Sequence, residues 1–263
     1  MAKRRNPTHA EISPADRMAH LRDQKPVALG KFHIGCAFFD GRRVMFAVDN
    51  PNDEIQRHHL AGEFYEPEEL DIIRKAFTPG TNFIDIGSNV GNHAVYVAMV
   101  LDAAKVVAFE PNPAAYEVLT ANVVLNGLED VVDLSWLGYG VSNQNSDGFG
   151  VEYWGGNLGG AKLVELDGGN ISLRKADDML GDVRADFVKI DVEGMELTVL
   201  EGLDATIARD RPTMFIEIDN VNRDGFLAWV ENKSYRIVDT FQRYGSNENF
   251  LLAPSEKGEE KDA

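Results

Sequence analysis

The stretch Thr81-Asn-Phe-Ile-Asp-Ile-Gly-Ser-Asn-Val-Gly-Asn92 passes within a few residues from an apolar run to small and polar residues, and the apolar segment 93–101 follows it. This pattern predicts a buried parallel strand, a tight glycine loop and a helix. Gly87 and Gly91 allow the backbone to bend sharply and to approach a ligand closely. The first turn of the helix leaves N–H groups unpaired beside that loop. The stretch therefore predicts the binding site of a nucleotide-type cofactor.

The spacing of the two glycines indicates which kind of cofactor binds. A dinucleotide fingerprint has the form Gly-x-Gly-x-x-Gly, and its middle glycine makes room for a pyrophosphate. Here Gly87 and Gly91 are separated by Ser88, Asn89 and a valine, so the middle glycine is missing. Asp85, two residues before the loop, places a carboxylate where a phosphate is repelled and an ammonium group or a ribose hydroxyl is favoured. We therefore expect a cationic nucleoside.

A second acidic residue supports this interpretation. The segment Lys105-Val-Val-Ala-Phe-Glu-Pro111 is typical of a short strand that ends at Glu110. In such folds the acid that binds a ribose lies about 20 residues beyond the glycine loop, as Glu110 does. Segments 83–91, 108–113 and 187–196, in this order, resemble the FkbM family of methyltransferases. The resemblance extends over roughly residues 60–252.

The resemblance implies an enzyme that uses S-adenosylmethionine to methylate a hydroxyl group of a small molecule, a sugar or a glycosylated natural product. It also implies that the segment around Glu66 lies over the mouth of the cofactor site. Gly140, near the end of a later strand, is expected to approach the adenine ring closely. The residues expected at the cofactor are Glu66, Asp85, Gly87, Ser88, Asn89, Gly91, Glu110, Pro111, Gly140 and Asp191.

Composition limits the class of protein and its partners. The chain has 263 residues, 44% of them hydrophobic, which allows one large α/β domain with an appendage or two small domains. Its 43 acidic and 26 basic residues give a net charge of −17, so we expect no nucleic-acid partner. No apolar run is long enough to span a membrane, and no secretory signal is seen, so we expect a cytoplasmic protein. Cys36, the single cysteine, is predicted to be a small buried residue. The oligomeric state is left open.

The expected fold class is α/β, with a Rossmann-like sheet of the class I methyltransferase type. We expect an N-terminal arm and β/α cap over residues 1–60, the methyltransferase domain over 61–254 and a disordered tail over 255–263. In the cap, a short helix begins at Ser13-Pro14, and strands 27–34 and 43–48 flank an Asp40-Gly41 turn. A helix after Asp53 stops at Gly62, and another starts near Pro67. On the first of these, adjacent His58 and His59 point in different directions, so we expect a solvated or gating role rather than metal ligation.

The remaining elements follow from local patterns. After the glycine loop, further strands are predicted at 105–110, 131–141, 186–192 and 212–220, mostly parallel, with helices at 113–125, 193–202 and 225–233. The resemblance adds a closing antiparallel hairpin from 235–239 and 249–253. The glycine-rich segment 148–169 is expected to form an irregular or hairpin insertion. Its Tyr153 and Trp154 either contact the substrate or, as we favour, pack in a turn.

Candidate catalytic residues lie after the carboxyl ends of the strands, where ligands bind in open α/β sheets. Asp191 and Glu193 are expected to orient or deprotonate the acceptor, although Asp191 also suits a helix N-cap. Lys189 lies in the middle of a buried strand and therefore needs a partner. We predict a row of Asp85, Lys189 and Glu217 beneath the site, in which Lys189 holds the carboxylates in place or forms a purely structural ion network.

The sequence also bears on a metal ion and on rival functions. Asp191, Glu217, Asp219 and Asn220 offer enough oxygen ligands for magnesium or calcium. We favour metal-free catalysis, because Lys189 is expected to engage Glu217, and Asp219 and Asn220 suit a helix cap. The rival functions are a Rossmann-type oxidoreductase, disfavoured by the missing glycine, and a non-catalytic module that binds S-adenosylmethionine.

Overall fold

The computed structural model describes residues 13–255, except 24, 26, 28 and 154–157. Its centre is a seven-stranded sheet, whose strands in spatial order are β12 (Tyr235–Phe241), β13 (Asn247–Pro254), β11 (Thr213–Asp219), β10 (Phe187–Ile190), β3 (Asn82–Ile86), β4 (Lys105–Phe109) and β5 (Val132–Asp133). The strands from β11 to β5 are parallel, and β13 is antiparallel to both β11 and β12. The predicted α/β class and the closing antiparallel hairpin are confirmed.

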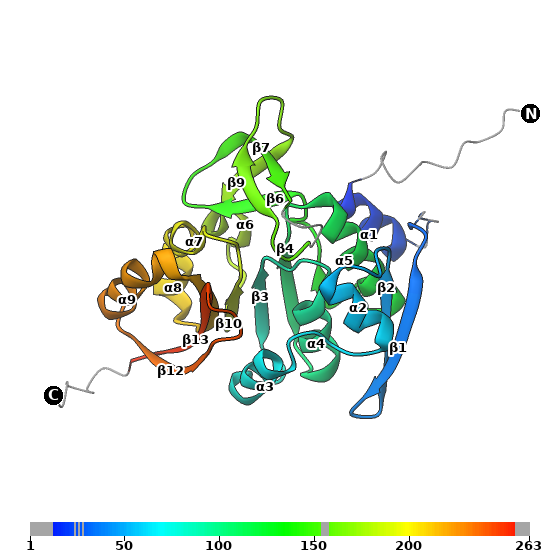
Figure 1. Cartoon of the computed structure of the whole chain (residues 1–263), viewed down its shortest axis with the longest axis horizontal. Helices are drawn as coiled ribbons and strands as arrows, with labels where there is room; N and C mark the ends of the chain where they lie inside the picture. Colours follow the sequence, from blue (N-terminus) through cyan, green and yellow to red (C-terminus); the bar gives the residue numbers. More distant parts are fainter. Residues whose placement is uncertain (1–12, 24, 26, 28, 154–157, 256–263) are drawn as a thin grey trace, which may run out of the picture.

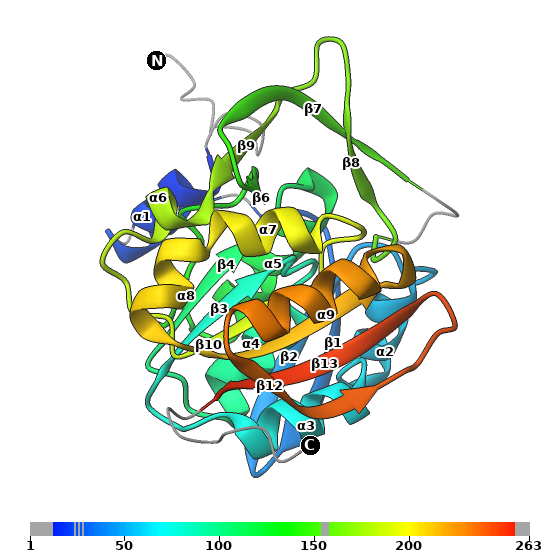
Figure 2. The same ribbon diagram turned by 90° about the vertical axis from the view of Figure 1, so that its left-hand side faces the viewer.

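Helices cover both faces of this sheet (Figures 1 and 2). One face carries α3 (Pro67–Ala76), α4 (Asn92–Val100) and α5 (Pro113–Leu125). The other face carries α6 (Ala176–Leu180), α7 (Glu196–Gly202), α8 (Asp204–Asp210) and α9 (Arg223–Asn232). The 3-10 turn η2 (Asn220–Asn222) immediately precedes α9. Because side chains alternate along a strand, Phe83 and Phe187 join the core under α4, whereas Ile84 and Val188 join the core under α7. Two apolar cores therefore hold the central strands in place.

A second, four-stranded sheet lies over the carboxyl ends of the central strands (Figure 1). We call it the rim sheet; its strands in spatial order are β6 (Tyr139–Ser142), β9 (Ile171–Lys175), β7 (Ser146–Glu152) and β8 (Lys162–Glu165). The predicted single strand over 131–141 is wrong, because the central sheet receives only β5 and the chain then turns into β6. Residues 135–138 form a turn, in which Gly138 has φ 89° and its N–H donates to the Glu110 carbonyl at 2.8 Å, so β6 begins beside the end of β4. The predicted hairpin insertion is the β7–β8 pair.

The N-terminal cap contains helix α1 (Pro14–Arg22), the hairpin β1 (His33–Phe39) and β2 (Arg42–Val48), and helix α2 (Glu54–Ala61). Ser13 caps α1 by accepting from the Asp16 N–H, as expected for the predicted helix start. Asp40 and Gly41 form the predicted turn, with φ of 50° and 78°. The predicted first strand was too early in the sequence, because pairing runs up to this turn, with Phe39 opposite Arg42.

The cap also corrects two predictions about side chains. Cys36 is exposed. Successive residues of β1 face opposite sides, and Gly35 is the one that faces the backbone of α2 at His59. His59 is neither solvated nor a gate. Its buried ring stacks on Phe46 at 4.3 Å and lies 3.1 Å from Asn92 Oδ1. Burial lowers the pKa of His59 to about 4, so the imidazole is a neutral part of the core.

One helix begins later than the sequence predicts. Helix α7 starts at Glu196 with Met195 at its N-cap, so Glu193 does not open the helix and Asp191 does not cap it. Glu193 has φ 38° and Gly194 has φ 98°, and these left-handed conformations exclude a helix there. The expected tail beyond Ser255, residues 1–12 of the arm and Trp154 lie outside the described residues. Throughout the described ranges, every helix is too short or too polar to cross a bilayer.

Candidate active site

The glycine loop joins β3 to α4 and lies against the end of β10. Gly87 has φ 82°, and a Cβ built on it would lie 1.8 Å from the carbonyl oxygen of Asp191. The Asp191 N–H in turn donates to the Ile86 carbonyl at 3.0 Å. The N–H groups of Gly87 and Ser88 both donate to the Phe109 carbonyl at 3.0 Å, which fixes the loop against β4. Glycine is therefore required at position 87 by the adjacent backbone of β10.

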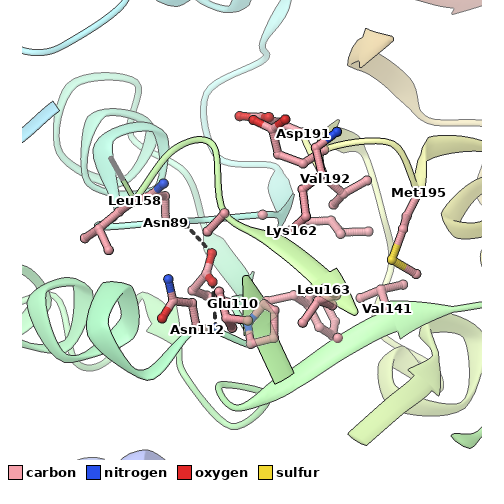
Figure 3. Close-up of a pocket in the computed structure, with 18 of the residues that line it drawn as sticks. Asn89, Glu110, Asn112, Val141, Leu158, Lys162, Leu163, Asp191, Val192 and Met195 are labelled. Carbon is pink, nitrogen blue, oxygen red and sulfur yellow. Dashed lines mark hydrogen bonds between the residues drawn. The ribbon is translucent and has the colours of Figure 1, made fainter. Parts of the chain in front are cut away.

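Glu110, at the end of β4, is held by the backbone on both sides. Its carboxylate accepts the N–H groups of Asn89 and Asn112, both at 2.8 Å (Figure 3). The side chain is 7% exposed. Burial raises the pKa of Glu110 to about 7, although the two backbone N–H groups act in the opposite direction. This carboxylate has a fixed position at the edge of a cavity.

That cavity, the nucleoside cavity, lies between the glycine loop and the rim sheet. Figure 3 shows Glu110 at one end, Asp191 at the other, and Val141, Leu163 and Met195 along the walls. Pro111 and Gly140 also line it, as do Ile86, Phe109 and Lys162. At Gly140 a Cβ would lie 2.5 Å from Leu173 and 2.8 Å from Leu163, so this glycine permits the close packing of the cavity wall. The cavity thus combines apolar walls with one anchored carboxylate.

A second cavity, the carboxylate cavity, opens on the other side of the loop. Its lining comes from the α2–α3 connection, the loop, α4, the ends of β10 and β11 and the turn before β13, and includes Tyr65, Glu66, Ser88, Asn92, His93, Lys189, Glu217, Tyr244 and Asn247. The two cavities share the loop residues Gly87 and Asn89 and the carboxylates of Asp191 and Glu193. One elongated ligand can therefore pass from the first cavity into the second beside the glycine loop.

Lys189 connects the carboxylates beneath the loop. Its Nζ donates to the Gly87 carbonyl at 2.8 Å and lies 3.1 Å from Asp191 Oδ2 and 3.5 Å from Asp85 Oδ1. The predicted row is thus correct for Asp85 and Lys189 and wrong for Glu217. Lys189 is in register with Phe215 on β11, so Glu217 lies two residues closer to the carboxyl end of that strand. There the side chain of Asn247 donates to Glu217 at 2.8 Å.

The carboxylates at the rim influence one another. Burial first, and then the charge of Asp191, raises the pKa of Glu193 to about 7 and that of Glu217 to about 9. One oxygen each from Asp191, Glu193 and Glu217 lies within 4.8 Å of the others, a spacing that suits a hard divalent cation. This set differs from the predicted one. Asp219 and Asn220, the other candidate ligands in the sequence, have different partners. Asp219 Oδ2 lies 3.6 Å from Lys162 Nζ, and the Asn220 side chain donates to the Gly245 carbonyl.

Some residues expected at the cofactor lie just outside the cavities. Asp85 is fully buried behind Lys189 and lines neither cavity. Gly91 is also absent from both linings, and a Cβ there would lie 2.4 Å from Leu119 of α5. The Ser88 hydroxyl donates to the Asp85 carbonyl at 2.9 Å. Ser88 still lines the carboxylate cavity, whereas Asp85 and Gly91 shape the loop from behind, and a direct role for these three residues at the cofactor stays a prediction.

Several residues that line the carboxylate cavity were not predicted from the sequence. His93 is a polar residue inside the apolar run that forms α4, and this contrast was the available signal. Tyr65 and Tyr244 approach from distant parts of the chain, and their hydroxyl groups lie 2.7 Å apart. Tyr153, which we expected to pack in a turn, lines neither cavity and donates to Asn112 Oδ1 at 2.7 Å.

Comparison with known proteins agrees with this geometry. Residues 85–246 match the model of the methyltransferase FkbM domain. The hexuronic acid methyltransferase AglP of Haloferax volcanii is 36% identical over 71% of this chain and 76% of its own length. The methyltransferase sdnD of Sordaria araneosa is 29% identical over 57% of this chain and 70% of its own.

A solved structure agrees on the fold. The tRNA m1G37 methyltransferase of M. jannaschii aligns with a TM-score of 0.50 at 14% identity, over 88% of this chain and 57% of that one. At this identity the likeness concerns the fold alone. The family match and the similarity to AglP favour methyl transfer over the oxidoreductase alternative. The chain belongs to the FkbM family of methyltransferases.

Proposed function

We propose that this chain transfers the methyl group of S-adenosylmethionine to a hydroxyl group of a small molecule or saccharide. The observation that carries the proposal is the meeting of two unlike cavities at the glycine loop. One has apolar walls and the anchored Glu110, and the other is rich in carboxylates. A ligand with a nucleoside at one end and a cationic group near its middle matches this polarity.

The residues at the nucleoside cavity fit such a cofactor. Glu110 already accepts two backbone N–H groups, and its carboxylate oxygens retain lone pairs for ribose hydroxyls. The apolar walls formed by Phe109, Val141, Leu163 and Met195 suit a planar base. When bound, the cofactor supplies an electrophilic methyl group on a sulfonium.

The chain's own task is then to hold the acceptor in line and to remove its proton. Glu193 is the best candidate base, because it lines both cavities and its pKa is raised to about 7. A general base works best when its pKa lies near the operating pH. Asp191 is held by Lys189 at 3.1 Å, which suits it to orienting the ligand groups.

We favour catalysis without a metal ion. Two members of the three-carboxylate cluster already have partners, since Lys189 pairs with Asp191 and Asn247 donates to Glu217. A divalent cation would compete with both interactions.

The similarity to AglP, named for hexuronic acid, supports a saccharide as the acceptor.

The test is turnover of methyl-labelled S-adenosylmethionine with a panel of neutral sugars, a hexuronic acid and simple alcohols. We expect formation of S-adenosylhomocysteine with at least one hydroxyl acceptor. Glu193→Gln should lower the rate by roughly 10²–10⁴-fold, the usual effect of removing a general base. Glu165→Gln, an exposed glutamate on β8, is the matched control. Binding of a nicotinamide dinucleotide in place of S-adenosylhomocysteine would refute the proposal.

A further inference from the structure

Lys189 already pairs with Asp85 and Asp191, the acids that the sequence places nearest the cofactor. Asp85 is fully buried, and Lys189 lies between it and Asp191. Lys189 also occupies the Gly87 carbonyl, the backbone acceptor at the loop, at 2.8 Å. The positive charge of Lys189 thus disfavours a ligand cation beside these groups, so the other acceptors that line the carboxylate cavity are the better candidates to bind it.

Glu66 and His93 also line the carboxylate cavity. Glu66 precedes α3, and His93 lies in the first turn of α4, so two separate elements bring them together. His93 Nε2 is 3.9 Å from Glu66 Oε2, too far for a hydrogen bond. His93 is 6% exposed, and its Nε2 has no hydrogen-bond partner in the described part of the chain.

A buried ring nitrogen without a partner is unusual, because buried polar groups are nearly always hydrogen-bonded. Glu66 is also unusual, since it adopts a left-handed conformation with φ 59° and ψ 54° although it is not glycine. That conformation places its carboxyl group on the cavity wall instead of in the solvent. Burial and the positive charge of Lys189 lower the pKa of His93 well below its ordinary value, so the imidazole is neutral and Nε2 can accept.

We propose that Glu66 and His93 form a subsite for a primary ammonium group. One ammonium nitrogen carries several N–H donors, so it can bind two acceptor atoms that lie 3.9 Å apart. Burial and the charge of Asp191 raise the pKa of Glu66 to about 8, and a bound cation favours the ionised form of this carboxyl group. The inference rests on the proposed function, because the ammonium group belongs either to the amino-acid end of the cofactor or to an amino group on the acceptor.

The test compares two nucleosides by calorimetry. S-adenosylhomocysteine carries the amino-acid end, and 5′-methylthioadenosine lacks it. Glu66→Gln and His93→Phe should each weaken binding of S-adenosylhomocysteine by roughly tenfold or more, the usual effect of losing a hydrogen bond to a charged group. Binding of methylthioadenosine should stay unchanged. Glu63→Gln, three residues before Glu66 and outside both linings, is the matched control.

A purely structural role predicts a different pattern. Because His93 Nε2 has no partner, His93→Phe should not lower the melting temperature, whereas loss of a structural contact would lower it. Glu66→Gln keeps the size of the side chain and provides a second variant if His93→Phe does not fold.

The arms of the experiment separate the two sources of the ammonium group. If the wild type binds the two nucleosides equally, the source is the acceptor. Glucosamine should then raise the melting temperature of the wild type and of neither variant. An unchanged ratio of the two affinities in both variants, together with no effect of glucosamine, overturns the subsite. Failure of the wild type to bind either nucleoside instead refutes the proposed function, and the glucosamine arm still decides the subsite.

Discussion

Replacing Lys189 by methionine removes the positive charge that pairs with the fully buried carboxylate of Asp85. Asp85 is 0% exposed, and in the variant it loses the amine at 3.5 Å. Breaking a buried pair by removing one partner costs about 3–5 kcal/mol. The variant also loses the 2.8 Å hydrogen bond to the Gly87 carbonyl, which contributes about 1 kcal/mol. Asp191 is 34% exposed, so water compensates much of its charge.

Protonation of Asp85 sets an upper limit to the electrostatic penalty. Holding a carboxyl group of ordinary pKa near 3.9 in its neutral form costs about 1.4 kcal/mol per pH unit above that value, hence about 5.6 kcal/mol at pH 8 and about 1.5 kcal/mol at pH 5. Burial already raises the pKa of Asp85, and loss of Lys189 raises it further. A raised carboxyl pKa means that the folded state binds more protons, so stability falls as the pH rises.

Urea unfolding of Lys189→Met should therefore show a loss of about 3–5 kcal/mol at pH 8 and of less than about 2.5 kcal/mol at pH 5. In the wild type, burial alone would lower the pKa of Lys189, but the charges of Asp191 and Asp85 raise it. The stabilisation that charged Lys189 gives the folded state is therefore fully present below the ordinary lysine pKa, at pH 5 and at pH 8 alike. The double variant Lys189→Met with Asp85→Asn should recover much of the loss at pH 8. A loss that is independent of pH, or that the second substitution does not relieve, refutes this reasoning.

Four further predictions concern the active site. Glu110→Ala should weaken binding of S-adenosylhomocysteine by about 1–3 kcal/mol, measured by calorimetry, and an unchanged affinity would remove Glu110 from the ribose site. Gly87→Val should abolish that binding and also lower the melting temperature, because any Cβ there lies 1.8 Å from the Asp191 carbonyl; full binding would place the cofactor elsewhere. With Glu193 as the base, kcat/KM should rise as the pH passes about 7 and flatten in Glu193→Gln. Exhaustive chelation should leave turnover unchanged, whereas a loss restored by magnesium contradicts the metal-free mechanism.

The central sheet was predictable because its signals are local. The apolar run before Gly87, the strand that ends at Glu110 and the helix stop at Gly62 each depend on neighbouring residues alone. The strand predicted over 131–141 failed because its pattern does not show that the turn over 135–138 takes the chain into another sheet. The burial of Cys36 failed because β1 belongs to a two-stranded hairpin, and the sequence does not reveal which of its faces is covered.

The positions of the main site residues were predictable from the sequence, but several of the residues they interact with were not. Alternation along β10 places Lys189 and Asp191 on one face, and the structure brings them to 3.1 Å. The partner of Glu217 was missed because it depends on the register between β11 and β13, where Asn249 lies opposite Glu217 and Asn247 is the donor. His93 was missed because an apolar helical run conceals a polar residue whose role depends on Glu66, at the start of another helix.

A crystal structure with S-adenosylhomocysteine would show directly whether the two ends of one ligand occupy the two cavities. We expect the ribose hydroxyls against Glu110, the base among the apolar walls of the nucleoside cavity, and the amino-acid end in the carboxylate cavity. Density for the nucleoside away from Glu110, or a ligand that does not pass the loop between Gly87 and Asn89, would contradict this expectation.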